Sequence, residues 1–307
     1  MLNKIKANFS NLPKYLLKLC KKYSNRLILG QNRSIFKGSG VEFVDIREYI
    51  EGDDPRYIDW NVSARMNGLF VRNFQEEREI PIYAVIDLDS SMFFGTKSKL
   101  KIDLLQELVA IFINLSQSLH ERFGAIISFK QELAFFKPYK NLSQIFKILN
   151  FLNNISQDFK KNKEKYMGAR SNIVNLLKVA NQYIKRTATI LIFSSLIDIP
   201  SEDLFDKYLR ALKKIKNNEV YVFKISDKSE IYLPEVGNIT FKDPMTNAIK
   251  SFEIDSNISR EFQKRSQEKL QKLRKICQKN SVKLFEFFTD DNLESKIFDF
   301  LRKKNMA

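Results

Sequence analysis

Two carboxylates and two hydroxyls lie close together in the stretch DLDSSM, residues 87–92, directly after the apolar run IPIYAVI. Hard oxygen atoms of this kind are the ligands that Mg²⁺ and Mn²⁺ prefer, at about 2.0–2.1 Å in octahedral geometry. Alternation along the turn lets Asp87, Asp89 and Ser91 point the same way, which predicts a divalent metal site. In the alternative interpretation, Asp87 and Ser91 only cap the following helix and accept hydrogen bonds from backbone amides.

Alternating strands and helices are predicted through residues 81–304. The run PIYAVIDL is continuously apolar, as is typical of a strand buried on both faces of a sheet. Further apolar strands are predicted at 188–194, 219–225 and 282–288, and amphipathic helices around 98–121, 141–153, 171–184, 201–216 and 258–279. This order indicates an α/β fold with a mostly parallel sheet and helices on both faces.

Two shorter features complete this expected fold. The runs FGAIISF and LAFFKP are close enough to form a hairpin, which would add one antiparallel edge to the sheet. The runs EIYLP and SFEID predict two short strands in the last third of the chain. Ligands of open α/β sheets bind at the carboxyl ends of the strands, so DLDSSM is in the expected place for a functional site.

Three parts of the chain are distinguished by composition. Residues 1–30 predict a basic N-terminal helix, and residues 31–80 form a densely charged, β-rich segment that we expect to pack on the main domain. Residues 81–304 form the main α/β domain.

The net charge of +16 is unevenly distributed. Residues 1–40 hold nine Lys or Arg and no acidic residue, residues 41–80 hold ten acidic and five basic residues, and residues 260–280 hold eight basic and two acidic residues. Such asymmetry attracts anionic partners, so binding of nucleic acid or of an anionic membrane is one functional hypothesis. The other interpretation is a solvated helix face over 260–280, because apolar residues recur beneath the charges.

The remaining composition predicts a cytoplasmic protein. Cys20 and Cys277 are far apart and suggest neither a disulfide framework nor a metal pair. No apolar run reaches the roughly 18 residues of a membrane span, and the N-terminus lacks the apolar core of a signal peptide. The basic segment 1–30 could contact the inner membrane surface or a partner.

The sequence contains no recognisable motif for catalysis. His120 is the single histidine, so neither a Ser-His-Asp nor a Cys-His set can be argued. Neither G-x-G-x-x-G nor G-x-x-x-x-G-K-[ST] occurs. We therefore expect a protein that is not an enzyme.

The spacing of DLDSSM resembles the metal-ion-dependent adhesion site of von Willebrand factor A domains, which share the predicted fold. In such a site two other loops supply a Thr and an Asp, and here Ser171 and Asp198 are the candidates. Asp89 stands where the motif has Ser, and Ser195 stands where it has Asp. The resemblance therefore implies a rearranged or degenerate site for Mg²⁺ or Mn²⁺.

A longer pattern upstream resembles the bacterial family known as domain of unknown function 58. Its hallmark is G-x-G-x-E-F, then R-x-Y-x-x-G-D-D-x-R-x-I-D-W, then S-A-R. The matching residues are Gly38, Gly40, Glu42 and Phe43, then Arg47, Tyr49, Gly52, Asp53, Asp54, Arg56, Ile58, Asp59 and Trp60, and then Ser63, Ala64 and Arg65. The resemblance covers about residues 30–304, in the short form of the family without membrane spans.

This resemblance implies a function in protein assembly. Members are similar to von Willebrand factor A domains and are thought to work with MoxR-type AAA+ ATPases in assembling or activating other proteins. The chain would then be an adaptor or co-chaperone that binds such an ATPase and a client protein.

Two roles are open for the charged signature residues. They could form an ion-pair network that fixes the segment against the main domain, with Trp60 as its apolar anchor. They could equally bind a partner, because exposed ion pairs contribute only about 0–1 kcal/mol each and give little structural reason for so much charge.

Overall fold

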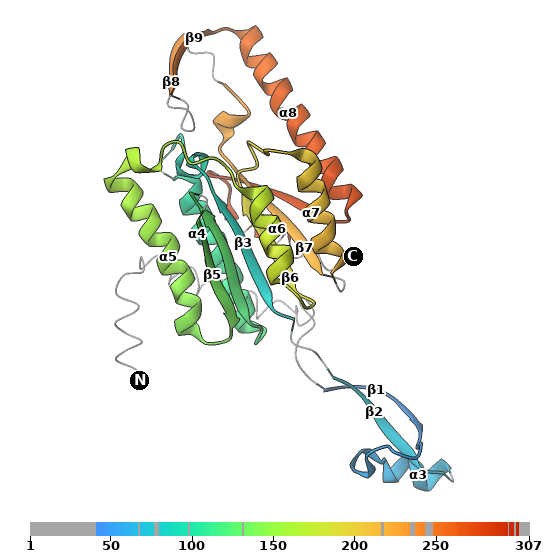
Figure 1. Ribbon diagram of the computed structural model, residues 1–307. Helices are drawn as coiled ribbons and strands as arrows, with labels where there is room; N and C mark the ends of the chain where they lie inside the picture. Colours follow the sequence, from blue (N-terminus) through green and yellow to red (C-terminus); the bar gives the residue numbers. More distant parts are fainter. Residues whose placement is uncertain are drawn as a thin grey trace.

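The computed structural model describes residues 41–300, apart from 67, 77–79, 98, 131, 216–217, 234–236, 243–247, 294 and 298. The basic segment 1–30, Gly38 and Gly40 lie outside the described residues. Figure 1 shows a sheet flanked by helices, a two-stranded unit that precedes it in the chain, and a second two-stranded ribbon that leads into a long helix. None of the described helices combines the length and apolar composition needed to cross a bilayer.

The central sheet has six strands in the order β10–β7–β6–β3–β4–β5. Its strands are β3 (Ile82–Leu88), β4 (Phe123–Phe129), β5 (Glu132–Tyr139), β6 (Thr189–Ser194), β7 (Glu219–Ser226) and β10 (Lys283–Phe288). Neighbouring strands are parallel except β5, which pairs antiparallel with β4. The prediction of a mostly parallel sheet with a hairpin at one edge is confirmed.

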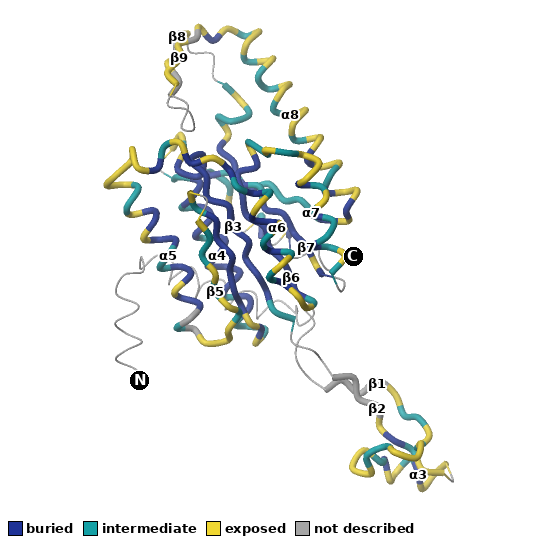
Figure 2. The backbone as a smooth tube through the Cα atoms, in the orientation of Figure 1, coloured by how far each residue is buried: buried dark blue, intermediate teal, exposed yellow. Residues whose placement is uncertain are grey.

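Helices cover both faces of this sheet, because alternate side chains of the central strands enter two separate apolar clusters. Ile82, Ala84 and Ile86 of β3 pack with α4 (Lys101–Ser118) and α5 (Leu142–Lys161). Tyr83 and Val85 pack with α6 (Ile173–Tyr183), α7 (Glu202–Lys214) and α8 (Ser256–Lys279). Burial on both faces explains the unbroken apolar sequence of β3, and Figure 2 shows this strand as buried throughout.

The edge hairpin contains one irregularity. The register between β4 and β5 shifts between Phe123 and Ala125, which leaves Gly124 at a bulge. A Cβ atom on Gly124 would lie 2.7 Å from the carbonyl oxygen of Phe136 and 2.8 Å from the nitrogen of Pro138. Only glycine therefore fits where β5 crosses this point.

The second ribbon differs from the sequence prediction. Its strands are β8 (Gly237–Lys242) and β9 (Ile249–Ile254), so SFEID is correctly assigned to a strand, but the described part of EIYLP, residues 230–233, is not a strand. Residues 228–230 form the short helix η4 instead, since the Asp227 side chain accepts from the backbone of Ser229 and the Glu230 side chain accepts from the backbone of Asp227. These two side-chain hydrogen bonds stabilise a helical turn at the start of EIYLP, although its composition is typical of a strand.

The signature unit, defined here as residues 41–76, is built around a hairpin. Strands β1 (Val41–Glu48) and β2 (Phe70–Glu76) pair antiparallel, and η1 (Pro55–Tyr57) and α3 (Trp60–Met66) lie between them. Figure 1 shows the unit away from the six-stranded sheet. The packing of residues 31–80 on the main domain stays a prediction, and the ion pairs described below for residues 41–76 lie within the unit.

Candidate functional site

The residues of DLDSSM lie at the carboxyl ends of two adjacent parallel strands. Asp87 is near the end of β3, and β3 pairs directly with β6, which ends at Ser194. The segment that precedes α6 brings in Ser171. We call Asp87, Asp89, Ser91, Ser171, Ser194 and Ser195 the strand-end cluster; all six are at most 6% exposed.

Asp87 accepts three hydrogen bonds from neighbouring segments. Ser171 Oγ donates to Oδ2 at 2.6 Å, and Ser194 Oγ donates to the same oxygen at 3.1 Å. The backbone nitrogen of Asn172 donates to Oδ1 at 3.1 Å. Asp87 therefore joins the ends of β3 and β6 to the start of α6.

Asp89 has an equally complete set of donors. Ser91 Oγ and the backbone nitrogen of Met92 donate to Oδ1, at 2.5 and 3.2 Å. Ser195 Oγ donates to Oδ2 at 2.9 Å. Asp89 is thus the N-cap of the short helix η2 (Ser90–Phe93), so the capping role suggested for Asp87 and Ser91 belongs to Asp89.

Of the predicted ligands, Asp198 alone is not brought into the cluster. The contacts of Asp87 and Asp89 with this loop are made by the hydroxyls of Ser194 and Ser195. Leu196 follows with a φ of 50°, and its nitrogen donates to Ser194 Oγ. The chain therefore turns directly after Ser195, before it reaches Asp198.

Burial and the nearby Asp89 carboxylate raise the pKa of Asp87 to about 7, although the hydrogen bonds from Ser171, Asn172 and Ser194 oppose this rise. Removing a carboxylate from water disfavours its charged form, and a second negative charge adds to the effect. Asp87 therefore changes its protonation state close to neutral pH.

Lys101, at the start of α4, adds a positive charge beside the cluster. Its side chain is 0% exposed, and Nζ donates to Ser91 Oγ at 3.3 Å and to Glu230 Oε1 at 2.5 Å. A fully buried lysine is rare and needs a charged partner, which Glu230 of η4 provides. An ammonium group thus contacts one of the predicted metal ligands.

The oxygen atoms of the cluster suit a divalent metal, but the positive charge of Lys101 beside them does not. Two carboxylates and several hydroxyls are suitable ligands for Mg²⁺ or Mn²⁺. However, the described residues contain no group of three or more His, Cys, Asp or Glu placed to hold a metal. An ion bound to Ser91 would also be repelled by the Lys101 ammonium on the same oxygen. Metal binding therefore stays a prediction.

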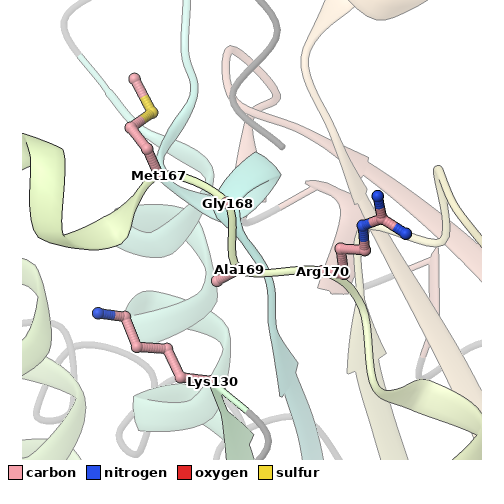
Figure 3. A pocket seen from close by; sticks show the side chains of 5 residues that line it. All are labelled: Lys130, Met167, Gly168, Ala169 and Arg170. Atoms are coloured by element: carbon pink, nitrogen blue, oxygen red, sulfur yellow. The ribbon is translucent and has the colours of Figure 1, made fainter. Parts of the chain in front are cut away.

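A second feature lies beside the cluster, in the segment that precedes α6. A cavity of about 470 Å³ is lined by Lys130, Met167, Gly168, Ala169 and Arg170. Figure 3 shows Lys130 and Arg170 extending in different directions from either side of this segment. Ser90 holds the segment: its nitrogen donates to the Ala169 oxygen at 2.8 Å, and its Oγ donates to the oxygens of Tyr166 and Ala169.

Ion pairs connect neighbouring residues of the signature unit. Arg47 donates to both carboxylate oxygens of Asp53, at 2.7 and 2.8 Å, and Arg56 donates to Asp54. The Arg47 guanidinium and the Ile50 backbone nitrogen lower the pKa of Asp53 to about 2. Both pairs join residues of the unit itself, and a bidentate pair fixes geometry as well as charge. A network that fixes the unit against the main domain stays a prediction.

Asp59 connects α3 to β2 in the same unit. Its Oδ1 accepts from the backbone nitrogens of Asn61 and Val62, and its Oδ2 accepts from Arg72 Nε at 2.8 Å. The signature residue Arg65 lies in the last turn of α3, and Glu42 lies in β1 opposite Gln75.

Trp60 does not act as the apolar anchor considered above, because it is 67% exposed. Four other large apolar residues of the unit are also exposed: Ile50, Tyr57, Met66 and Leu69. Figure 2 shows that much of the unit is exposed. Trp60 is therefore part of an exposed apolar surface of the unit and not of a buried core.

Three polar residues near the site were not singled out from the sequence as part of it. Lys101 and Glu230 form the buried pair described above. Asp227 accepts from Thr96 and Thr289, and these hydrogen bonds hold its pKa well below the usual range although burial alone would raise it. The one available signal was a lysine at the start of a helix whose next turns are rich in apolar residues.

A family comparison agrees with the signature. The sequence profile of a family described as "Protein of unknown function DUF58" matches residues 45–272 of the 307. The chain belongs to this family. The match to DUF58 includes the strand-end cluster, the cavity segment, and the signature unit from Asp45 onward.

Relatives of this DUF58 chain include uncharacterised proteins of Mycobacterium bovis and Mycobacterium tuberculosis. Each is 24% identical over 234 residues, which cover 76% of this chain and 70% of the relative.

Two solved structures resemble the fold. One is a conserved hypothetical protein BatB from Bacteroides thetaiotaomicron, with a TM-score of 0.44, 11% identity, and coverage of 74% of this chain and 100% of that chain. The other is an aerotolerance-related membrane protein from Bacteroides fragilis, with a TM-score of 0.45 and the same identity and coverage. Similarities this distant carry no functional assignment.

Proposed function

We propose that this DUF58 chain is a non-enzymatic protein-interaction module with an A-type domain like that of von Willebrand factor. In this proposal it is an adaptor or co-chaperone that works with a MoxR-type AAA+ ATPase on a client protein. The signature unit contacts the ATPase, and the carboxyl edge of the sheet contacts the client. The ATPase is proposed from the signature resemblance.

The exposed apolar side chains of the signature unit carry this proposal. Trp60 and Met66 are 67% and 64% exposed, although they lie on one short helix held by a capping aspartate and an ion pair. Exposed clusters of large apolar residues mark interaction sites, and tryptophan is enriched among the residues that dominate binding energy. The β1–β2 hairpin and the contacts of Asp59 with α3 and Arg72 position these residues on the surface of the unit.

Burial of the strand-end cluster supports a role other than catalysis. Asp87 and Ser171 are 1% and 6% exposed, and their closest polar contacts are with each other. A nucleophile or general base must come within hydrogen-bonding distance of its substrate. A substrate could not reach these side chains without rearranging the end of the sheet.

The test is binding of the purified chain to a MoxR-type ATPase from the same organism, measured by calorimetry. We expect Trp60→Ala together with Met66→Ala to weaken binding by at least about tenfold, since truncation of a central anchor costs about 2 kcal/mol or more. Tyr232→Ala is the control, because Tyr232 is 53% exposed and lies outside the unit. Equal affinity of the wild type and the double variant would refute the assignment of this surface.

Binding of an anionic surface is the second candidate, and α8 is the observation that favours it. Its cations Lys264, Lys269, Lys272 and Lys275 are exposed, whereas Arg274 is paired with Glu286. Retention on DNA or anionic vesicles that weakens steeply with salt would support this function. No retention at low salt would eliminate it.

A further inference from the structure

Two exposed cations stand at the rim of the strand-end cluster. Arg170 directly precedes Ser171, and its guanidinium forms no ion pair or hydrogen bond with any residue that the structure describes. Lys130 lies at the turn between β4 and β5 with a φ of 50°. Its Nζ is 5.4 Å from the ring centre of Phe129 and 5.2 Å from that of Tyr166. These aromatic rings hold Lys130 in place and leave its charge available.

The cavity between these cations is formed in advance. Its floor is the segment from Met167 to Arg170, which Ser90 fixes through three hydrogen bonds to the oxygens of Tyr166 and Ala169. Gly168 takes a φ of 80°, a conformation that glycine adopts without strain. A ligand that binds here therefore does not bear the entropic cost of ordering the loop.

The acidic groups below the cavity are not available to a partner. Each carboxylate oxygen of Asp87 and Asp89 already accepts a hydrogen bond, and both side chains are at most 1% exposed. Lys101 adds a positive charge next to Ser91. The charged side chains that line the cavity itself are therefore the cations Lys130 and Arg170.

We propose that this edge binds an acidic segment of a partner protein directly through Arg170 and Lys130, without a bridging metal ion. Arg170 pairs with one carboxylate through its planar guanidinium, Lys130 attracts a second carboxylate, and the Met167 thioether contacts apolar parts of the peptide. This inference rests on the proposed function, because it names the chemistry of the partner that the strand-end edge receives.

The geometry favours a peptide over a nucleic acid. Binding to a single strand requires a basic groove that follows the backbone, together with aromatic faces on which bases stack. Here the two cations extend in different directions from a cavity of about 470 Å³. Phe129 and Tyr166 lie next to the Lys130 ammonium, so they already have a partner for their faces.

The test is fluorescence anisotropy with the full chain and a fluorescein-labelled peptide of alternating Glu and Gly residues, in 20 mM salt with EDTA. We expect binding that is lost with a peptide of alternating Gln and Gly. The double variant Lys130→Ala, Arg170→Ala should bind the acidic peptide at least about tenfold more weakly. The matched control is Lys185→Ala, Arg186→Ala, because this pair has the same charge, is exposed, and follows the opposite end of α6.

Four outcomes would overturn the inference. They are absence of peptide binding by the wild type, an equal loss in the control variant, a requirement for added Mg²⁺, and displacement of the peptide by oligo-dT at lower concentration than by unlabelled peptide. If the wild-type chain does not bind a MoxR-type ATPase but binds the peptide as described, the proposed function is contradicted and this inference stands. Full client and ATPase binding by the Lys130, Arg170 variant would contradict this inference alone.

Discussion

Replacing Asp87 by Asn should change the free energy of unfolding in a pH-dependent way. The value for Asp87→Asn minus that for the wild type should be larger at pH 8 than at pH 4. The Asp87 carboxyl is 1% exposed, and its folded pKa of about 7 lies about three pH units above the ordinary aspartate value. Between pH 4 and pH 7 the folded protein therefore holds a proton at Asp87 that the unfolded chain has lost. Stability from this group is fully present below pH 4 and is lost as the pH rises through 7.

The size of the effect follows from the same two pKa values. Each pH unit between the folded and unfolded pKa corresponds to 1.36 kcal/mol, so charging Asp87 reduces the free energy of unfolding by about 4 kcal/mol. Asn has the same shape and carries no charge. Its Oδ1 can still accept from the Asn172 nitrogen, and the hydroxyls of Ser171 and Ser194 can rotate to accept from its Nδ2.

Urea denaturation of wild type and Asp87→Asn, followed by circular dichroism at each pH from 4 to 8, measures this difference. EDTA in every buffer ensures that protons alone bind the site. Asp198→Asn is the matched control, because it removes a carboxylate from the adjacent loop, outside the strand-end cluster. Free energies of unfolding of wild type and Asp87→Asn that change in parallel from pH 4 to pH 8 would show that Asp87 does not titrate near neutral pH in the folded protein.

Three further predictions concern stability and reactivity. Lys101→Met should destabilise the protein by about 3 kcal/mol in urea denaturation because it leaves Glu230 without its buried partner, and adding Glu230→Gln should restore much of the loss. In a Cys20→Ser variant, Cys277 should not react with an iodoacetamide reagent at pH 8 until the protein unfolds, since burial raises the pKa of its thiol to about 12; labelling of the native protein would contradict this. Asp59→Ala should speed amide hydrogen exchange in α3 by removing its cap and the bond from Arg72, and unchanged exchange would show that neither contact holds the helix.

The sheet could be predicted because its strands follow simple physical rules. β3 is buried on both faces, so its sequence is continuously apolar, and the two strands of the edge hairpin flank a two-residue turn. The place of DLDSSM at a strand end followed from these strands alone. The strand assigned to EIYLP was wrong because the side-chain caps of Asp227 and Glu230 favour a helical turn.

The candidate site could be predicted only in part, because long-range contacts decide it. Ser171 joins Asp87 as expected, but the turn at Leu196 that leaves Asp198 out of the cluster is not encoded in a recognisable motif. Lys101 enters the site through Glu230, 129 residues away, and no local pattern indicates that pairing. The exposure of Trp60 likewise depends on where the signature unit lies, which the sequence of that unit does not determine.

The bulge at Gly124 has a consequence for self-association. β5 is an edge strand of the sheet, and an open edge offers backbone groups to which a strand of another molecule can add. The shifted register at Gly124 increases the local twist, and Pro138 and the charged Lys137 and Glu132 interrupt this edge. Growth of the sheet into fibrils or strand-swapped dimers along β5 is therefore disfavoured.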